Sequence, residues 1–261
     1  MFDFLPIGID RLELFLLCLF RITGLVMLAP LIGDNSVPVM IRVGFSILLS
    51  IIAVLVLPLT AAPVTGSDAE LLLLVARELF IGLIIGFGFR MLVYGIQAAG
   101  WLIGYQIGFS IANIIDPTTG SEQSIIAQFW FMIGALIFLC LNGHHLIIQA
   151  VMQSYELLPL GRQLALDSWH QITQLTATVF VLALKLSAPI VLSLFLIDVA
   201  LATISRLIPT MNVFVIGFVI KAGAGIMVMV ITLPIFAYVL EKTTTYLDRE
   251  VLTLIAGMGR S

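Results

Sequence analysis

Long stretches of apolar residues without charge follow one another along the chain, and this pattern predicts membrane-spanning helices. A helix needs roughly 20 apolar residues to cross the hydrocarbon core of a bilayer. Four uncharged stretches are long enough, namely Val43–Ser67, Met91–Ile115, Gln123–Tyr155 and Ala222–Leu240. The polar Asn142-Gly143-His144-His145 interrupts the third stretch, so we expect that helix to end near Leu141.

Charged residues interrupt or flank the other apolar segments, which are Leu12–Ile32 with Glu13 and Arg21, Leu79–Phe89 between Arg77-Glu78 and Arg90, and Ile172–Ala200 with Lys185 and Asp198. A charge in mid-bilayer costs at least ~2.5 kcal/mol, so such side chains normally pair or face water or protein. Snorkelling near helix ends would account for Arg42, Arg77 and Arg90 but hardly for Lys185 or Asp198. We therefore expect other subunits to cover many of these helices. The intramembrane charges that need a partner are Arg21, Lys185, Asp198, Arg206 and Lys221.

Composition points the same way: 61% of the 261 residues are hydrophobic, only 10% are charged, and the mean hydropathy is +1.18. A soluble domain carries roughly 25% charged residues, so a membrane or a membrane-level complex is the expected surrounding. The net charge of −3 argues against nucleic acid as a partner. Cys18 and Cys140 lie in apolar runs, and we interpret both as buried thiols. We identify no cleavable signal peptide and expect all helices to belong to the mature protein.

Glycines recur at intervals of four residues in two places, at Gly82 and Gly86 and at Gly100, Gly104 and Gly108. Residues four apart share one face of a helix, so each series lets another backbone approach closely. The second series runs into a polar segment in which Pro117 disfavours helical geometry at Asp116. A glycine-lined helix therefore ends in a loop, and we expect a new apolar helix to begin after Glu122.

The motifs of nucleotide-binding loops, zinc proteases and serine hydrolases do not occur in the sequence. His144 and His145 are adjacent, so on a helix they point about 100° apart and cannot chelate one ion from a single face. We interpret them as a polar helix end. The sequence thus predicts no enzyme, no cofactor and no catalytic or metal-binding residues. A polar interval, Leu160–Gln171, is the expected internal boundary between the first four helices and the last two.

Four groups of residues, in order along the chain, resemble the FliR family, which includes the matching component of virulence type III secretion systems. They are Arg21 with Ala29-Pro30-Leu31-Ile32-Gly33, Val37-Pro38 and Arg42; Gly104-Tyr105-Gln106-Ile107-Gly108-Phe109-Ser110 with Asp116-Pro117; Leu141-Asn142-Gly143-His144-His145 with Ser154 and Pro159; and Arg206-Leu207-Ile208-Pro209-Thr210-Met211-Asn212-Val213-Phe214 with Lys221. Together they extend from about residue 20 to about residue 240.

The resemblance implies an all-α, membrane-associated fold of about six long, partly broken hydrophobic helices in a multi-subunit helical cone. It implies a FliP-like part at residues 1–165 and, at residues 166–261, a FliQ-like hairpin with a C-terminal amphipathic segment. The implied partners are FliP- and FliQ-like subunits, an FlhB-like protein, exported polypeptides and membrane lipid. The implied location is the bacterial inner membrane at the flagellar basal body, where the assembly is the entry gate for exported proteins.

The resemblance also implies that the loop after the central helix plugs the closed channel; here it maps to about Phe109–Glu122. An apolar constriction excludes water and thereby ions, and this loop has apolar bulk and a proline break. Without the family, an ordinary helix connection would be the simpler interpretation. The implied plug residues are Phe109, Ser110, Ile111, Asn113, Ile114, Ile115, Asp116 and Pro117.

Two other functional classes remain open from the residues themselves. One is a secondary transporter or ion channel that acts alone, with Lys185, Asp198 and Lys221 as a coupling site. The other is an integral membrane enzyme, for which we find no clustered acid–base or metal set. The sequence does not decide between flagellar and virulence cargo, and we favour the flagellar version.

Overall fold

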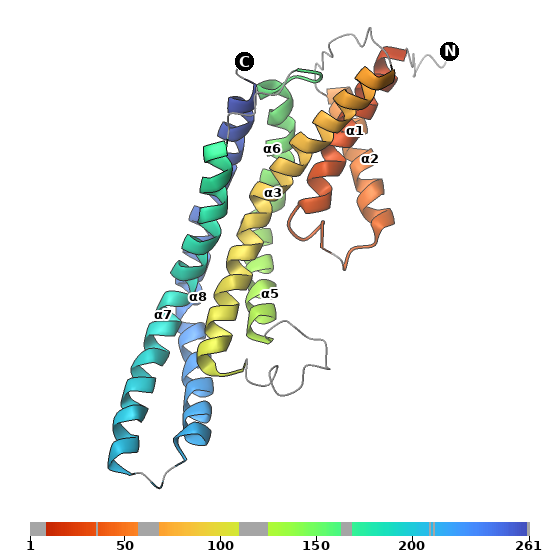
Figure 1. The fold of residues 1–261 in the computed structure, drawn as a ribbon. Helices are drawn as coiled ribbons and strands as arrows, with labels where there is room; N and C mark the ends of the chain where they lie inside the picture. The colour runs from red at the N-terminus through yellow and green to blue at the C-terminus, as the bar shows by residue number, and fades with distance from the viewer. Residues whose placement is uncertain are drawn as a thin grey trace. The chain divides into compact units, whose positions relative to one another are not determined.

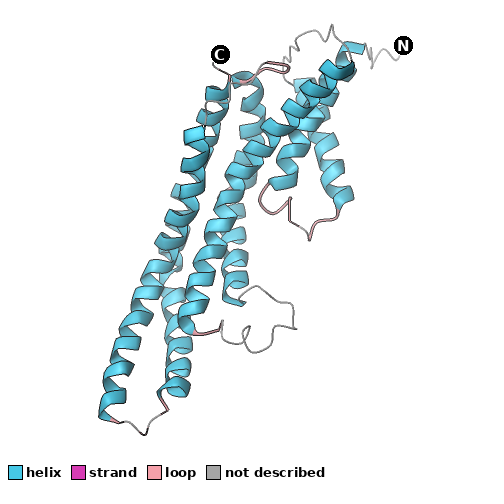
Figure 2. Ribbon diagram, viewed as in Figure 1, coloured by secondary structure: helices cyan, strands magenta, loops and turns pink. Residues whose placement is uncertain are grey.

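The structure is a computed structural model that describes residues 9–34, 36–56, 68–109, 125–162, 169–208, 210 and 212–259. Within these residues the regular secondary structure is entirely α-helical (Figures 1 and 2). The helices are α1 (Ile9–Leu28), α2 (Val39–Val56), α3 (Asp68–Ile107), α5 (Ile125–Cys140), α6 (Gly143–Leu157), α7 (Trp169–Leu207) and α8 (Val213–Met258). The predicted all-α fold is confirmed, with seven described helices rather than about six. The multi-subunit cone stays a prediction.

Helix α3 joins two segments that the sequence analysis treated as separate, Leu79–Phe89 and the first part of Met91–Ile115. It runs without interruption for 40 residues, about twice the length that one bilayer crossing needs. No proline lies between Asp68 and Ile107, so no peptide group in this stretch lacks its helical donor. The charged Glu78 does not end the helix because its carboxylate is paired with Arg21.

Helices α7 and α8 also extend beyond the predicted segments. They contain 39 and 46 residues, and each continues through an internal proline, Pro189 in α7 and Pro234 in α8. Proline removes one helical hydrogen bond, and long apolar helices tolerate this where neighbouring groups re-satisfy the backbone. The charged residues that interrupt or bound the predicted segments, such as Lys221 and Glu241, therefore do not end these helices.

Helices α5 and α6 form a bent pair with an angle of 65° between them. α5 ends at Cys140, close to the predicted end, and Asn142 adopts a left-handed backbone with φ 56°. Asparagine is one of the few residues other than glycine that visit this region readily. The polar Asn142-Gly143 step is thus the physical cause of the bend.

Four described helices, α2, α3, α7 and α8, are long and apolar enough to cross a membrane, or five spans if the bent α5–α6 pair counts as one. In each of these four helices, between 22% and 39% of an apolar stretch of 18 consecutive residues is buried within the chain. Most of the apolar surface of the candidate spans is therefore left for lipid or for other proteins to cover.

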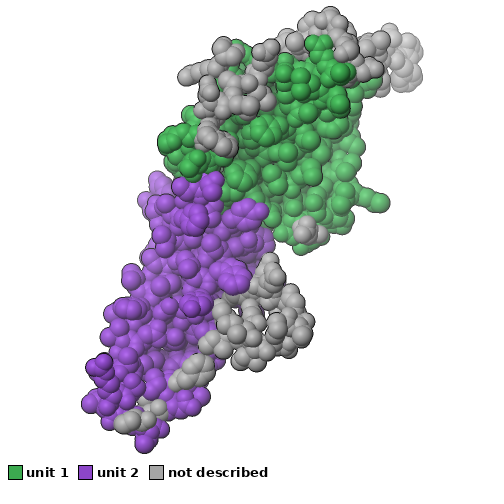
Figure 3. All heavy atoms as spheres, viewed as in Figure 1, with its two compact units in different colours: residues 1–91, 142–175, 245–261 green, residues 92–141, 176–244 purple. Residues whose placement is uncertain are grey.

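The chain divides into two compact units (Figure 3). Unit 1 comprises residues 1–91, 142–175 and 245–261, and unit 2 comprises residues 92–141 and 176–244. In unit 1, α1 packs against α2, and the fully buried side chains include Leu17, Ile22, Ile85 and Phe89. In unit 2 they include Ile103, Ile107 and Trp130. The division at residue 165 into FliP-like and FliQ-like parts concerns likeness to other subunits and stays a prediction.

Candidate functional site

A buried ion pair lies at the centre of unit 1. Arg21 of α1 is fully buried, and its Nε donates to Oε2 of Glu78 on α3 at 2.6 Å. Its Nη1 donates to Oγ of Ser154 on α6 at 3.1 Å, and its Nη2 donates to the carbonyl oxygen of Leu158 at 3.0 Å. The guanidinium also lies 4.5 Å from the centre of the Tyr155 ring. Each nitrogen of this buried charge therefore has a partner.

Glu78 is satisfied on its second oxygen as well, because Oε1 accepts a hydrogen bond from the backbone N–H of Gly161 at 3.2 Å. The cluster thus joins α1, α3, α6 and the turn after α6 through one residue pair. A buried pair of this kind is costly to desolvate, and removal of one partner leaves an uncompensated charge. In unit 1 the pair therefore connects these elements by direct hydrogen bonds.

The predicted glycines of α3 lie where backbones approach closely. A Cβ added to Gly82 would collide with the carbonyl oxygen of Arg21, and one added to Gly86 would lie 2.7 Å from the carbonyl oxygen of Leu25. In unit 2, a Cβ added to Gly100 would lie 2.5 Å from Cα of Ala127 on α5. These approaches are within one chain, and any contact of the glycines with another subunit stays a prediction.

The C-terminal end of α3, in unit 2, has a well-defined cap. Gly108 has φ 104°, a value that glycine adopts without a steric cost. The N–H of Gly108 donates to the carbonyl oxygen of Tyr105, and the N–H of Phe109 donates to that of Gly104, both at 3.1 Å. This pair of bonds is a Schellman motif, so Gly108 ends the helix and sets the direction in which the chain leaves it.

Two side-chain contacts hold this capped end against α7 and α8, and an ion pair joins these two helices beside it. Nε2 of Gln106 donates to Oδ2 of Asp198 at 2.9 Å, and the other oxygen of Asp198 lies 3.1 Å from Nζ of Lys221. The Phe109 ring meets the Phe218 ring edge to face, with 5.6 Å between centroids. We call Gln106, Asp198, Lys221, Phe109 and Phe218 the α3 clamp. Asp198 and Lys221 also line a cleft of about 270 Å³ beside Gly108.

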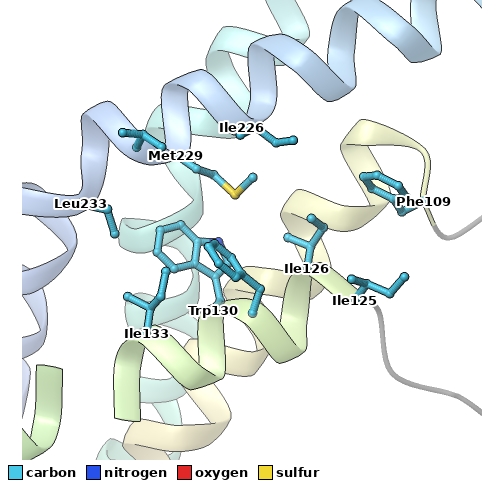
Figure 4. A pocket seen from close by; sticks show the side chains of 10 residues that line it. Phe109, Ile125, Ile126, Trp130, Ile133, Ile226, Met229 and Leu233 are labelled. Carbon is cyan, nitrogen blue, oxygen red and sulfur yellow. The ribbon is translucent and has the colours of Figure 1, made fainter. Parts of the chain in front are cut away.

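An apolar pocket of about 380 Å³ lies between the end of α3, the start of α5 and α8 (Figure 4). Trp130 lines the pocket and stacks on Phe236, with 4.4 Å between ring centroids. The Trp130 Nε1–H is buried and has no acceptor among the described residues. Phe109 and Ile125, the described residues on either side of residues 110–124, both line the pocket. The two described residues that flank residues 110–124 in the sequence therefore lie at the same apolar pocket.

The structure distributes the remaining predicted residues differently. Of the implied plug, only Phe109 lies within the described part of the chain; Ser110, Ile111, Asn113, Ile114, Ile115, Asp116 and Pro117 lie outside it. Lys185 and Arg206 are exposed on α7. His144 and His145 lie in the first turn of α6. In the described residues no three His, Cys, Asp or Glu side chains are placed to share a metal ion.

Sequence reasoning missed the partners of the charged residues. Glu78 was treated as a segment boundary, although it is the only acidic residue of α3 beyond the first turn and could have been matched to Arg21. Gln106, Ser154 and Phe218 carry no such signal, because polar amides, serines and phenylalanines are frequent in apolar helices. Their roles follow only from the contacts described above.

The chain matches the family described as bacterial export proteins, family 1, over residues 12–246. The flagellar biosynthetic protein FliR of Bacillus subtilis is 31% identical over 257 residues, which cover 97% of this chain and 98% of that protein. FliR of Escherichia coli is 28% identical over 94% of this chain and 92% of its own length. The surface presentation of antigens protein SpaR of Shigella flexneri is 30% identical over 60% of this chain and 61% of its own length. This chain therefore belongs to the family of bacterial export proteins that includes FliR and SpaR.

Proposed function

We propose that this flagellar-type export component forms part of the channel through which unfolded flagellar proteins cross the bacterial inner membrane. In this proposal it assembles with FliP- and FliQ-like subunits and an FlhB-like protein, with residues 1–165 as the FliP-like part and 166–261 as the FliQ-like part. The supporting observation is the apolar surface that the chain leaves uncovered on every candidate span. An isolated chain with charges such as Lys185 on that surface is a poor fit to lipid alone.

Assembly is tested by purification of the tagged chain in mild detergent from cells that make the whole set of export proteins. We expect FliP- and FliQ-like subunits to co-purify, and we expect the chain to restore motility to a strain that lacks its own FliR. A homogeneous, folded monomer that transports ions or solutes in liposomes by itself would contradict this proposal. It would favour the stand-alone transporter.

The α3 clamp supports a gating role for the segment that follows it. Phe109 is fixed by the cap at Gly108 and by Phe218, so the chain enters residues 110–124 from a defined position. Phe109 and Ile125 both line a pocket without polar side chains apart from the buried indole of Trp130. Apolar surfaces of this kind exclude water and so block ions. We infer that this end of α3 is the fixed side of the gate.

The gating role is tested by deletion of Ile111–Ile115. We expect the complex to assemble in normal amounts while cells become permeable to ions or small dyes. A matched deletion of five residues in 163–168, another segment outside the described residues, is the control and should not cause a leak. A complex that lacks Ile111–Ile115 and is still assembled, ion-tight and export-competent would refute the plug.

A further inference from the structure

Between Val181 and Val199, one exposed face of α7 combines large apolar side chains with a single charge, that of Lys185. At 100° per residue, Val181, Leu184, Lys185, Leu192, Phe195 and Val199 lie within an arc of about 100°. Leu184 is 62% exposed, Leu192 is 63% exposed and Phe195 is 56% exposed, and Lys185 is exposed among them. We call these six residues the Lys185 face. Within the described residues Lys185 has no hydrogen bond or ion pair, whereas Lys221 is paired with Asp198.

Neither water nor lipid suits this face. If a bilayer boundary lay at Lys185, the exposed Phe180, Val181 and Leu184 would stand in water. If the boundary lay beyond Phe180, the ammonium group would stand in hydrocarbon, where an unpaired charge is costly. The backbone adds a second polar group at this level, because Pro189 has no N–H to donate to the Lys185 carbonyl. By contrast, the outward apolar residues of α8 between Ala222 and Leu240 include no charge and fit lipid well.

We propose that the Lys185 face is an interface for an apolar helix of a different subunit, one that carries an aspartate or glutamate opposite Lys185. Such a helix would cover Leu184, Leu192 and Phe195 and would neutralise the ammonium group. It would thereby remove both the cost of apolar side chains in water and the cost of an unpaired charge in hydrocarbon. This proposal rests on the proposed function, since it requires assembly with other membrane subunits. A close charge pair of this kind fixes the register of two helices as well as their attraction.

In its described residues, a second copy of this chain offers no unpaired carboxylate in the middle of an apolar helix. The acidic residues of the described helices are either already paired, near a helix end or in a polar stretch. Asp10 and Glu13 lie in the first two turns of α1, and Glu156 lies in the last turn of α6. Glu78 and Asp198 are already paired with Arg21 and Lys221. Asp68 and Glu70 lie in the first turn of α3, and the rest lie in the polar stretch 241–250 of α8. We therefore assign the partner helix to a different subunit.

Photo-cross-linking tests the identity of the partner. The cross-linking amino acid p-benzoylphenylalanine is placed at Leu184 in the full chain, in cells that make the complete export apparatus. We expect a cross-link to another membrane subunit, mapped by mass spectrometry to an apolar helix that contains an Asp or Glu. The same amino acid at Ile231 on α8, which is 68% exposed, is the matched control. Cross-links from residue 184 to lipid alone, to a second copy, or to a helix without an acidic residue would each overturn the proposal.

Charge variants test the pairing. We expect Lys185→Glu to lower the yield of purified complex at least about tenfold, because it sets two like charges against each other, whereas Lys185→Arg retains it. Change of the acidic residue on the cross-linked helix to lysine should restore the yield of the Lys185→Glu complex.

Lys221→Glu is the control. Asp198→Lys in the same chain should restore the yield of the Lys221→Glu complex, and it should not restore the yield of the Lys185→Glu complex. A wild-type yield for Lys185→Glu would overturn the proposal, and should this variant fail to accumulate in membranes, the cross-link at residue 184 decides alone. If the wild-type chain purifies without other subunits, the proposed function itself fails.

Discussion

The Arg21–Glu78 pair allows a prediction about the stability of the folded chain. Loss of the Glu78 charge should destabilise the wild type but stabilise a variant that already lacks the Arg21 charge. Glu78→Ala leaves the fully buried guanidinium of Arg21 without its counter-charge, at a cost of about 3–5 kcal/mol in the free energy of unfolding. Arg21→Met leaves the Glu78 carboxylate unpaired, with a similar cost. The double variant Arg21→Met, Glu78→Leu removes both charges. We therefore expect the double variant to be more stable than either single variant.

The magnitude follows from the hydrogen bonds that remain. Relative to Glu78→Ala, the double variant additionally deprives the Leu158 carbonyl of its donor, and one orphaned buried polar group costs about 1–3 kcal/mol. Removal of the unpaired charge regains about 3–5 kcal/mol, so the rescue prevails. Since 1 kcal/mol shifts the Tm of a chain of 150–250 residues by about 2–4 °C, each single variant should lose at least about 6 °C.

The assay is the Tm of the detergent-solubilised protein, followed by fluorescence-detected gel filtration after heating. Glu70→Ala is the matched control on the same helix, because Glu70 is exposed and its loss should change stability by less than about 0.5 kcal/mol. The reasoning would be refuted if the Tm of the double variant were no higher than the Tm of the less stable single variant. It would equally be refuted if Glu78→Ala melted together with Glu70→Ala.

Three further substitutions test the helix contacts. Gly82→Leu should abolish stable accumulation in membranes, because an added Cβ meets backbone, whereas Gly223→Leu, which has open space around it, should accumulate normally. Gly108→Ala should lower the Tm by a few degrees relative to Gly223→Ala, because Gly108 has φ 104° and a left-handed alanine costs roughly 1–2 kcal/mol. Gln106→Leu removes the hydrogen bond to Asp198, and we expect an assembled complex with a raised ion leak in a dye-uptake assay; an unchanged leak would separate the clamp from gating.

The sequence alone determined the fold class and the surroundings of this protein. Uncharged apolar runs longer than a bilayer crossing and a charged fraction of 10% require helices in a membrane or in a membrane-level complex. It also identified glycines such as Gly82 as points of close approach, because the four-residue interval is a property of the helix itself. These inferences depend on local periodicity and composition, which are readable from residues near one another in the chain.

Only the tertiary structure decided which helix ends are real and which charges are paired. Arg21 and Glu78 are 57 residues apart, and Gln106 and Asp198 are 92 residues apart, so no local pattern connects them. Lys185 and Lys221 look alike in the sequence, as single lysines in apolar stretches. The fold gives Lys221 a carboxylate and leaves Lys185 on an exposed face. Pairing depends on which helix faces meet, and that is set by long-range packing of side chains rather than by the period of any one helix.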